Sequence, residues 1–107
     1  MQDDLVLSES ENALTAFIAC EVDHHTARRI RETIDERIFL CKPREIILDF
    51  HGVRFMDSSG IGLILGRSET ATSIGANLKI RGASPTLMKI LHLSGVDKVK
   101  NITIIRE

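Results

Sequence analysis

The stretch Phe55-Met56-Asp57-Ser58-Ser59-Gly60-Ile61-Gly62 decides how this 107-residue chain folds. A strand-like run over residues 45–50 precedes it, and a helix-like run continues from Gly60 to about Ile74. Asp57, Ser58 and Ser59 are residue types that accept hydrogen bonds from the unpaired N–H groups of a first helical turn. The stretch therefore predicts a strand-to-helix junction, with one of these three side chains as the N-cap.

Two glycines, Gly60 and Gly62, stand in the first turn of this predicted helix. A glycine inside a helix costs about 1 kcal/mol relative to alanine, so two in one turn require a reason. One such reason is the close approach of another molecule to the backbone. We therefore expect an exposed hydroxyl at the positive end of a helix dipole, beside a surface without side chains.

The rest of the chain alternates between strand-like and helix-like runs. Strands are predicted over residues 5–7, 14–19, 44–50, 77–81 and 102–105, and helices over 23–42, 60–74 and 84–95. After an opening hairpin, this alternation predicts successive right-handed crossovers. We expect one α/β domain over residues 1–107, with a mixed sheet of about five strands and three helices packed against it. The apolar run Ile46-Ile47-Leu48 predicts a strand buried on both faces.

The second predicted helix carries apolar residues on two sides. Ile61, Ile64 and Leu65 share the face that is predicted to pack on the core. Leu63 falls on the opposite side, together with Arg67. Leu63 is either covered by a neighbouring element or exposed as part of a contact surface, and the spacing leaves both interpretations open.

Composition and charge exclude several classes of protein. The chain has 14 basic and 15 acidic residues and a net charge of −1, which argues against a nucleic-acid or anionic-membrane binder. No apolar run approaches the ~20 residues of a membrane helix. The acidic, polar start, residues 1–4, is not a signal peptide, so a cytoplasmic protein is expected. Cys20 and Cys41 lack CxxC spacing and are expected to be buried, reduced thiols.

Three stretches in order carry a resemblance to a known family. They are Met56-Asp57-Ser58-Ser59-Gly60-Ile61-Gly62 followed by Ile64-Leu65-Gly66-Arg67, then Glu21-Val22-Asp23-His24-His25-Thr26-Ala27, and Ser84-Pro85 with Leu93-Ser94-Gly95. Together they resemble the STAS-domain anti-sigma factor antagonists, most of all the sporulation-type anti-sigma F factor antagonists. The family more often has Gly and Leu where this chain has Cys20 and Val22, and it often adds a helix after the last strand.

The resemblance implies a regulator that switches between protein partners. The unphosphorylated form would bind an anti-sigma factor serine kinase and so release the sigma factor. Phosphorylation on Ser58 would end binding, and a metal-dependent serine phosphatase would restore it. The protein would catalyse nothing and would need no cofactor or metal. The predicted partner-binding residues are Glu21, Asp23, Asp57, Ser59, Gly60, Ile61, Gly62 and Leu63. The same fold leaves a stressosome-like scaffold subunit and a weak nucleotide-binding module as alternatives.

Other interpretations of the same residues are weaker. Ser58 could be only a helix cap, and Ser59 could be the phosphoacceptor in its place. A hydrolase elbow of the GxSxG type would need glycine at Met56, and a base such as His51 or His92 would have to lie beside the serine. A dinucleotide fingerprint has the wrong glycine spacing. His24-His25 has no metal-ligand spacing, since adjacent helical residues point about 100° apart.

Acidic residues follow two of the predicted strands. Glu21 and Asp23 leave one strand end, and Asp57 leaves another. Because ligand surfaces gather outside the carboxyl ends of strands in open α/β sheets, these acids could form one acidic face beside Ser58. They could equally be two separate helix caps. The sequence leaves both possibilities open.

Overall fold

The structure is a computed structural model that describes residues 4–106, so that Met1 to Asp3 of the acidic start lie outside it. The strands are β1 (Leu5–Glu9), β2 (Ala13–Ile18), β3 (Glu45–Asp49), β4 (Asn77–Arg81) and β5 (Ile102–Ile104). The helices are α1 (His24–Cys41), α2 (Ser58–Ser73) and α3 (Pro85–Ser94), followed by the 3-10 turn η1 (Val96–Lys98). The predicted order of strands and helices is confirmed, with ends that differ by one or two residues at most positions.

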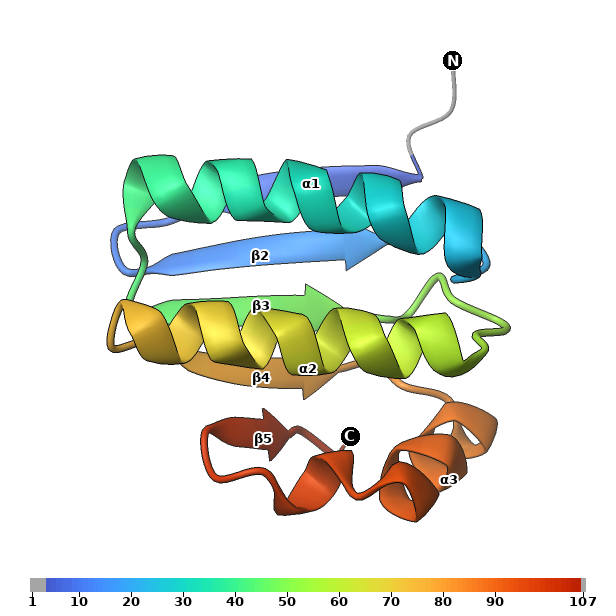
Figure 1. Ribbon diagram of the computed structural model, residues 1–107. Helices are drawn as coiled ribbons and strands as arrows, with labels where there is room; N and C mark the ends of the chain where they lie inside the picture. Colours follow the sequence, from blue (N-terminus) through green and yellow to red (C-terminus); the bar gives the residue numbers. More distant parts are fainter. Residues whose placement is uncertain (1–3, 107) are drawn as a thin grey trace.

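The five strands form one mixed sheet in the order β1-β2-β3-β4-β5 (Figure 1). β1 and β2 form the predicted antiparallel hairpin, and β2 to β5 run parallel to one another. Parallel strands end at the same edge, so the loops that leave β2 and β3 lie next to each other. This edge carries the starts of α1 and α2.

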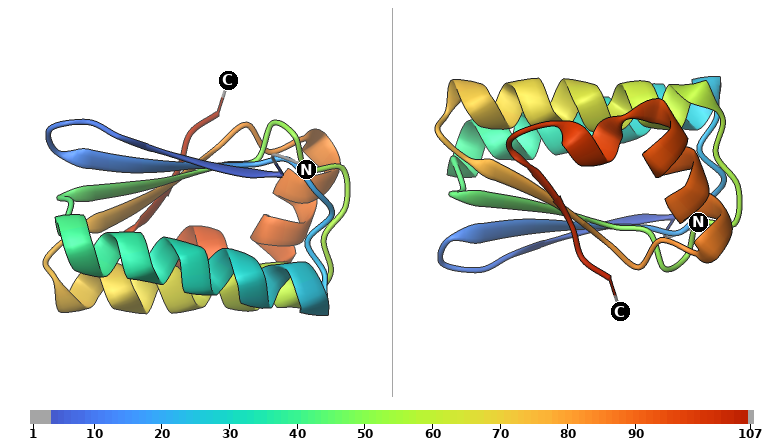
Figure 2. Two further views of the ribbon diagram at one scale, coloured as in Figure 1. Left: turned by 90° about the horizontal axis from the view of Figure 1, so that it is seen from above. Right: turned by 90° about the horizontal axis from the view of Figure 1, so that it is seen from below.

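One face of the sheet is covered by helices. Figure 2 shows α1 and α2 side by side beneath it, with α3 at one end on the same side. Ile46, Leu48 and Phe50 point to this face and are fully buried. Ile47, between them, is only half-buried. The prediction of a β3 strand buried on both faces is therefore wrong, because no helix of residues 4–106 covers the second face (Figure 2).

Local sequence signals set the ends of the helices. Asp23 caps α1, and α1 ends at Lys42, which adopts a left-handed conformation with φ 44° before Pro43. Ser84 caps α3 and Pro85 occupies its first turn, which suits a residue without an N–H group. The two N-caps, Asp23 and Ser84, lie in strand-to-helix connections, at the same edge of the sheet as Ser58.

The second helix has two buried faces, and this changes the predicted assignment of its residues. α2 packs on the sheet through Ile64 and on α1 through the opposite side. Leu63 and Arg67 are each 4% exposed, whereas Leu65, which was predicted to face the core, is 40% exposed. The assignment of Leu65 to the core was wrong. Because α2 packs on both the sheet and α1, the sides that carry Ile64 and Leu63 are buried, and Leu65 lies outside them. Of the two interpretations of Leu63, the structure supports the one in which a neighbouring element, here α1, covers most of its side chain.

Two further observations bear on the class of protein. Within residues 4–106, none of the helices combines the length and the apolar character needed to cross a bilayer. Cys20 and Cys41 are free thiols, and both are half-buried rather than fully buried as predicted. Burial is the largest cause that raises the pKa of each thiol above its ordinary value, so both favour the neutral form.

Candidate regulatory site at the start of the second helix

A short parallel bridge joins the two segments that precede α1 and α2. The Val22 N–H donates to the Phe55 carbonyl at 3.0 Å, and the Asp57 N–H donates to the Val22 carbonyl at 3.1 Å. Val22 and Met56 are almost completely buried, which anchors this bridge in the core. Glu21 and Asp23 therefore lie beside Asp57. Of the two arrangements that the sequence left open, the structure has the one in which these acids share one edge.

Asp57, and not a serine, is the N-cap of α2. Its carboxylate accepts a hydrogen bond from the Ser59 N–H at 2.7 Å. Ser58 is the first residue of the helix, and its side chain is exposed. The Ser58 hydroxyl forms no hydrogen bond with any residue between 4 and 106. The capping interpretation of Ser58 is thus replaced by an accessible, unengaged hydroxyl at a helix N-terminus.

The start of α1 is held by a reciprocal cap. The Asp23 carboxylate accepts from the His25 N–H at 2.9 Å and the Thr26 N–H at 3.0 Å, while the Thr26 hydroxyl accepts from the Asp23 N–H. The hydrogen bond from the Thr26 N–H is the largest cause that holds the pKa of Asp23 below its ordinary value. The Thr26 hydroxyl also donates to the Glu21 carbonyl at 2.7 Å. These hydrogen bonds therefore hold the backbone of Glu21 and Asp23 in place at this edge of the sheet.

The two glycines of the first turn have different surroundings. A Cβ atom on Gly60 would lie 2.6 Å from the Met56 sulfur and 3.0 Å from the Met56 Cβ. A Cβ atom on Gly62 would have no other atom within 4 Å. Gly60 is thus required by packing inside the chain, which corrects the expectation that both glycines serve an approaching molecule. Only Gly62 gives an open surface beside Ser58, and Ile61 next to it is half-buried.

Alanine at these two glycines should change stability in opposite directions. We expect Gly60→Ala to lower the free energy of unfolding by about 1–2 kcal/mol, because the clash with Met56 outweighs the better helix propensity. Gly62→Ala should raise it by about 0.5–1 kcal/mol, since alanine is the better helix former and meets no atom. Urea unfolding of both variants and the parent measures this; an equal change in both variants would contradict the packing role of Gly60.

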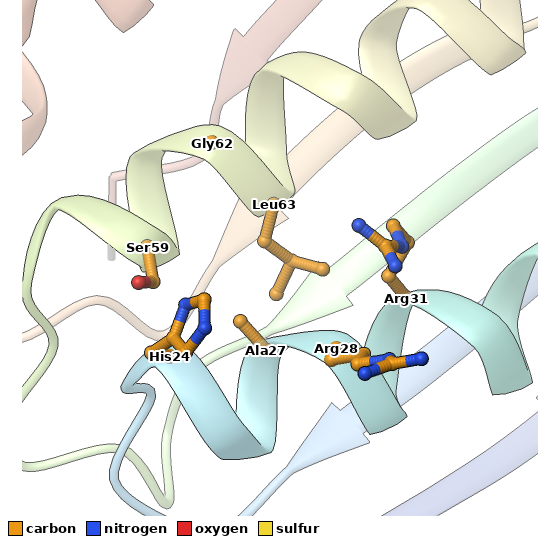
Figure 3. A pocket seen from close by; sticks show the side chains of 7 residues that line it. All are labelled: His24, Ala27, Arg28, Arg31, Ser59, Gly62 and Leu63. Carbon is orange, nitrogen blue, oxygen red and sulfur yellow. The ribbon is translucent and has the colours of Figure 1, made fainter.

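A hollow of about 460 Å³ lies between the first turns of α1 and α2. Its wall is formed by His24, Ala27, Arg28, Arg31, Ser59, Gly62 and Leu63, and we call it the α1–α2 hollow (Figure 3). Figure 3 shows the side chains of Ser59 from α2 and His24 from α1 at one end of it, with the two arginines toward the other end. Three of its seven residues are basic or can become so, and none is acidic. The expected acidic face therefore has a basic surface directly beside it.

Sequence reasoning missed the arginines of this hollow. Neither Arg28 nor Arg31 was predicted to belong to the site, because they follow no motif. A signal was available: residues 24, 27, 28 and 31 repeat at spacings of three and four, which places them on one stripe of a helix. On α2, Ser59, Gly62 and Leu63 follow the same spacing and form the facing stripe. What the chain alone did not reveal is that these two stripes face each other.

The two histidines that a hydrolase at Ser58 would need as a base are each held beside a carboxylate. The His51 Nδ1 lies 2.9 Å from the Asp49 carboxylate, and the His92 Nδ1 lies 2.8 Å from the Asp97 carboxylate. Neither histidine is hydrogen-bonded to Ser58, whose hydroxyl is unengaged by residues 4–106. Within that same range, no three His, Cys, Asp or Glu side chains gather in a way that could hold a metal ion.

Comparison with known proteins places this chain in a family. A family model for the STAS domain matches residues 4–105. The chain is 30% identical over 102 residues to an anti-sigma F factor antagonist of Paenibacillus polymyxa, covering 95% of this chain and 87% of the relative. The chain therefore belongs to the STAS domain family, as its motifs and its five-stranded mixed sheet indicated.

Two solved structures have the same fold. The unphosphorylated form of the anti-sigma factor antagonist SpoIIAA matches with a TM-score of 0.75 and 27% identity, covering 96% of this chain and 88% of that one. The phosphorylated form of SpoIIAA from Bacillus matches with a TM-score of 0.73 and 30% identity, covering 96% and 92%. Within the family, the chain is thus similar to anti-sigma factor antagonists for which both phosphorylation states have been solved.

Proposed function

We propose that this protein is an anti-sigma factor antagonist whose binding is switched off by phosphorylation on Ser58. Its unphosphorylated form binds an anti-sigma factor that is also a serine kinase, and this binding frees the sigma factor. The observation that carries the proposal is the exposed, unengaged Ser58 hydroxyl at the start of α2, in the motif that resembles the family's phosphorylation motif. The similarity to anti-sigma F factor antagonists and to a phosphorylated relative supports it.

The position of Ser58 explains why phosphate would change binding and leave the fold intact. A phosphoryl group adds about −1.5 to −2 charges at pH 7. The N-terminus of α2 favours such a charge by roughly 0.3–1 kcal/mol, so the domain tolerates it. A partner that packs closely on Gly62 would meet new bulk and charge beside Glu21, Asp23 and Asp57. The interface is therefore lost while the domain stays folded.

The proposed partners and their roles follow from this switch. The contact surface consists of Glu21, Asp23, Asp57, Ser59, Gly60, Ile61, Gly62 and Leu63. Leu63 contributes through the floor of the α1–α2 hollow, since it is 4% exposed, and Gly60 contributes through its backbone. A metal-dependent serine phosphatase restores the hydroxyl in the cytoplasm. The protein is a substrate and a regulator, and it performs no catalysis.

Complex formation with the anti-sigma factor kinase of the same organism tests the proposal. Size-exclusion chromatography should show a stable complex in ADP. In ATP the complex should dissociate as the protein gains 80 Da, and fragmentation should place the phosphate on Ser58. A protein that assembles with copies of itself or other STAS proteins, and never with the kinase, would instead indicate a scaffold subunit. The absence of both binding and phosphorylation would refute the proposal.

A further inference from the structure

The α1–α2 hollow has an excess of positive charge that the chain itself does not balance. Arg28 approaches Glu32 only at 3.9 Å, and both side chains are more than 60% exposed, so this pair is weak. Arg31 has no acidic partner within 4 Å anywhere in residues 4–106. His24 is exposed on the same wall as the two arginines, at the start of α1. The lining therefore presents one weakly paired arginine and one arginine without an ion-pair partner among residues 4–106 to a concave surface.

An ion pair between a buried arginine and a half-buried aspartate lies one helical turn beyond this hollow. Arg67 follows Leu63 by four residues on α2, and Asp35 follows Arg31 by four on α1. The Arg67 Nε lies 2.8 Å from the Asp35 carboxylate, yet the geometry makes no hydrogen bond, and Nη1 has no partner within residues 4–106. Burial is the largest cause that lowers the pKa of Arg67; the charge of Asp35 raises this pKa, and the charge of Arg31 lowers it. Arg31 and Arg67 thus repel each other, while Asp35 attracts both.

Backbone groups add to the same field. His24 and Ser59 stand in the first turns of α1 and α2, so both helices direct their positive ends toward the mouth of the hollow. The His25, Thr26 and Ser59 N–H groups already donate to Asp23 and Asp57, so the helices contribute their dipoles here rather than these donors. Arginine guanidinium groups match the oxygens of phosphate in a bidentate geometry. A volume of about 460 Å³ is in the range of small-ligand sites.

We propose that the α1–α2 hollow is a binding site for a phosphoryl group, held by His24, Arg28 and Arg31. The group has two possible sources, an external phosphate ligand or the phosphoserine that the proposed function places at residue 58. Ser59 lines the hollow and Ser58 precedes it directly, so a phosphate on Ser58 is tethered at the mouth. A short tether gives an effective concentration in the millimolar range or above. In that case the released form of the regulator is stabilised by its own phosphate.

The first arm of the test uses the unmodified protein and inorganic phosphate, and needs no kinase. In two-dimensional NMR titrations, the His24 imidazole and the Ser59 and Gly62 amides should shift and saturate. The double variant Arg28→Gln/Arg31→Gln should weaken this binding at least about fivefold, since both guanidinium groups are gone. The control variant Arg44→Gln/Lys100→Gln loses two exposed charges outside the lining and should bind as the parent does. Equal binding by parent and Arg28→Gln/Arg31→Gln overturns the site.

The second arm uses protein with phosphoserine incorporated at position 58 during translation. Its own phosphate should exclude added inorganic phosphate from the hollow. Phosphorus NMR should give a phosphoserine pKa about 0.5 unit lower than in the Arg28→Gln/Arg31→Gln background, because nearby cations favour the dianion. Apart from the two arginines, the parent and the variant background keep the same charged and titratable groups near this edge. These groups are Glu21, Asp23, His24, His25, Arg54 and Asp57.

The two arms separate the sources and separate this proposal from the proposed function. Binding of inorganic phosphate with exclusion by phosphoserine supports the tethered source. Binding that phosphoserine leaves unchanged supports the site and refutes the tether, and an external ligand then occupies it. Because the first arm involves neither the kinase nor phosphorylation, a failure there leaves the role of Ser58 standing. A failure to bind the kinase, in turn, does not affect the first arm.

Discussion

Ser58→Ala should bind the anti-sigma factor kinase and remain bound when ATP is turned over. The alanine keeps the surface small and uncharged, while the acceptor hydroxyl is gone. Because Ser58 is exposed and Asp57 provides the cap, the variant should stay within about 1 kcal/mol of the parent in stability. In cells this variant should free the sigma factor constitutively. Complex formation in ADP and ATP, followed by chromatography, measures the effect directly.

The matched variants are Ser58→Asp and Ser59→Ala. Ser58→Asp adds about one negative charge, fewer than phosphate adds, and should weaken binding on the order of 100-fold, since like charges across an interface cost several kcal/mol. Ser59→Ala should still be phosphorylated and released. If Ser58→Ala is phosphorylated on Ser59 as efficiently as the parent, the switch lies one residue further along. If Ser58→Asp binds as tightly as the parent, charge is not the cause of release.

Gly62→Leu should weaken binding to the kinase by about 10- to 100-fold while it raises the stability of the free domain. The open space around Gly62 is where a partner would pack against the backbone, and a leucine there forces a shift that costs about 1–3 kcal/mol. In the isolated domain the Cβ of the leucine enters open space, and the substitution gains about 1 kcal/mol of helix propensity. Calorimetric titration and thermal unfolding of one protein preparation test both parts.

Gly66 provides the control for this change. It also has no atom within 4 Å of a built Cβ, and it lies one turn further along α2, away from Ser58. Gly66→Leu should gain a similar stability and keep its affinity for the kinase. A Gly62→Leu protein that binds normally would remove the argument for a bare contact surface. Equal losses of affinity in the two variants would show that the contact extends along the whole helix.

Stretches that carry their own local signals were predicted correctly. Asp23 with Thr26, and Ser84 with Pro85, define helix starts through bonds within a few residues. The strand β4 was predicted at Asn77–Arg81 and has these bounds. The order of strands and helices, and with it the mixed sheet, followed from hydrophobic periodicity and connection length. Each of these properties depends on residues that are neighbours in the chain.

Properties that depend on pairs of distant elements were missed or left open. The chain showed that Leu63 and Arg67 share a stripe of α2, but only the packing of α1 shows that this stripe is buried. Gly60 and Gly62 look alike in the sequence, and Met56 alone makes the first one indispensable to packing. The basic residues of α1 acquire a shared surface with Ser59 through helix packing that no short motif encodes.

By itself the sequence determined the α/β class, the order of the elements, the junction before α2 and the motif around Ser58, because local hydrogen bonds and side-chain periodicity act over a few residues. Tertiary structure alone decided which acids lie side by side, through the Val22–Met56 bridge, and which cations face Ser59. The physical reason is that charge and steric effects act through space. Two residues 30 or more positions apart influence each other only once the sheet has brought their helices into contact.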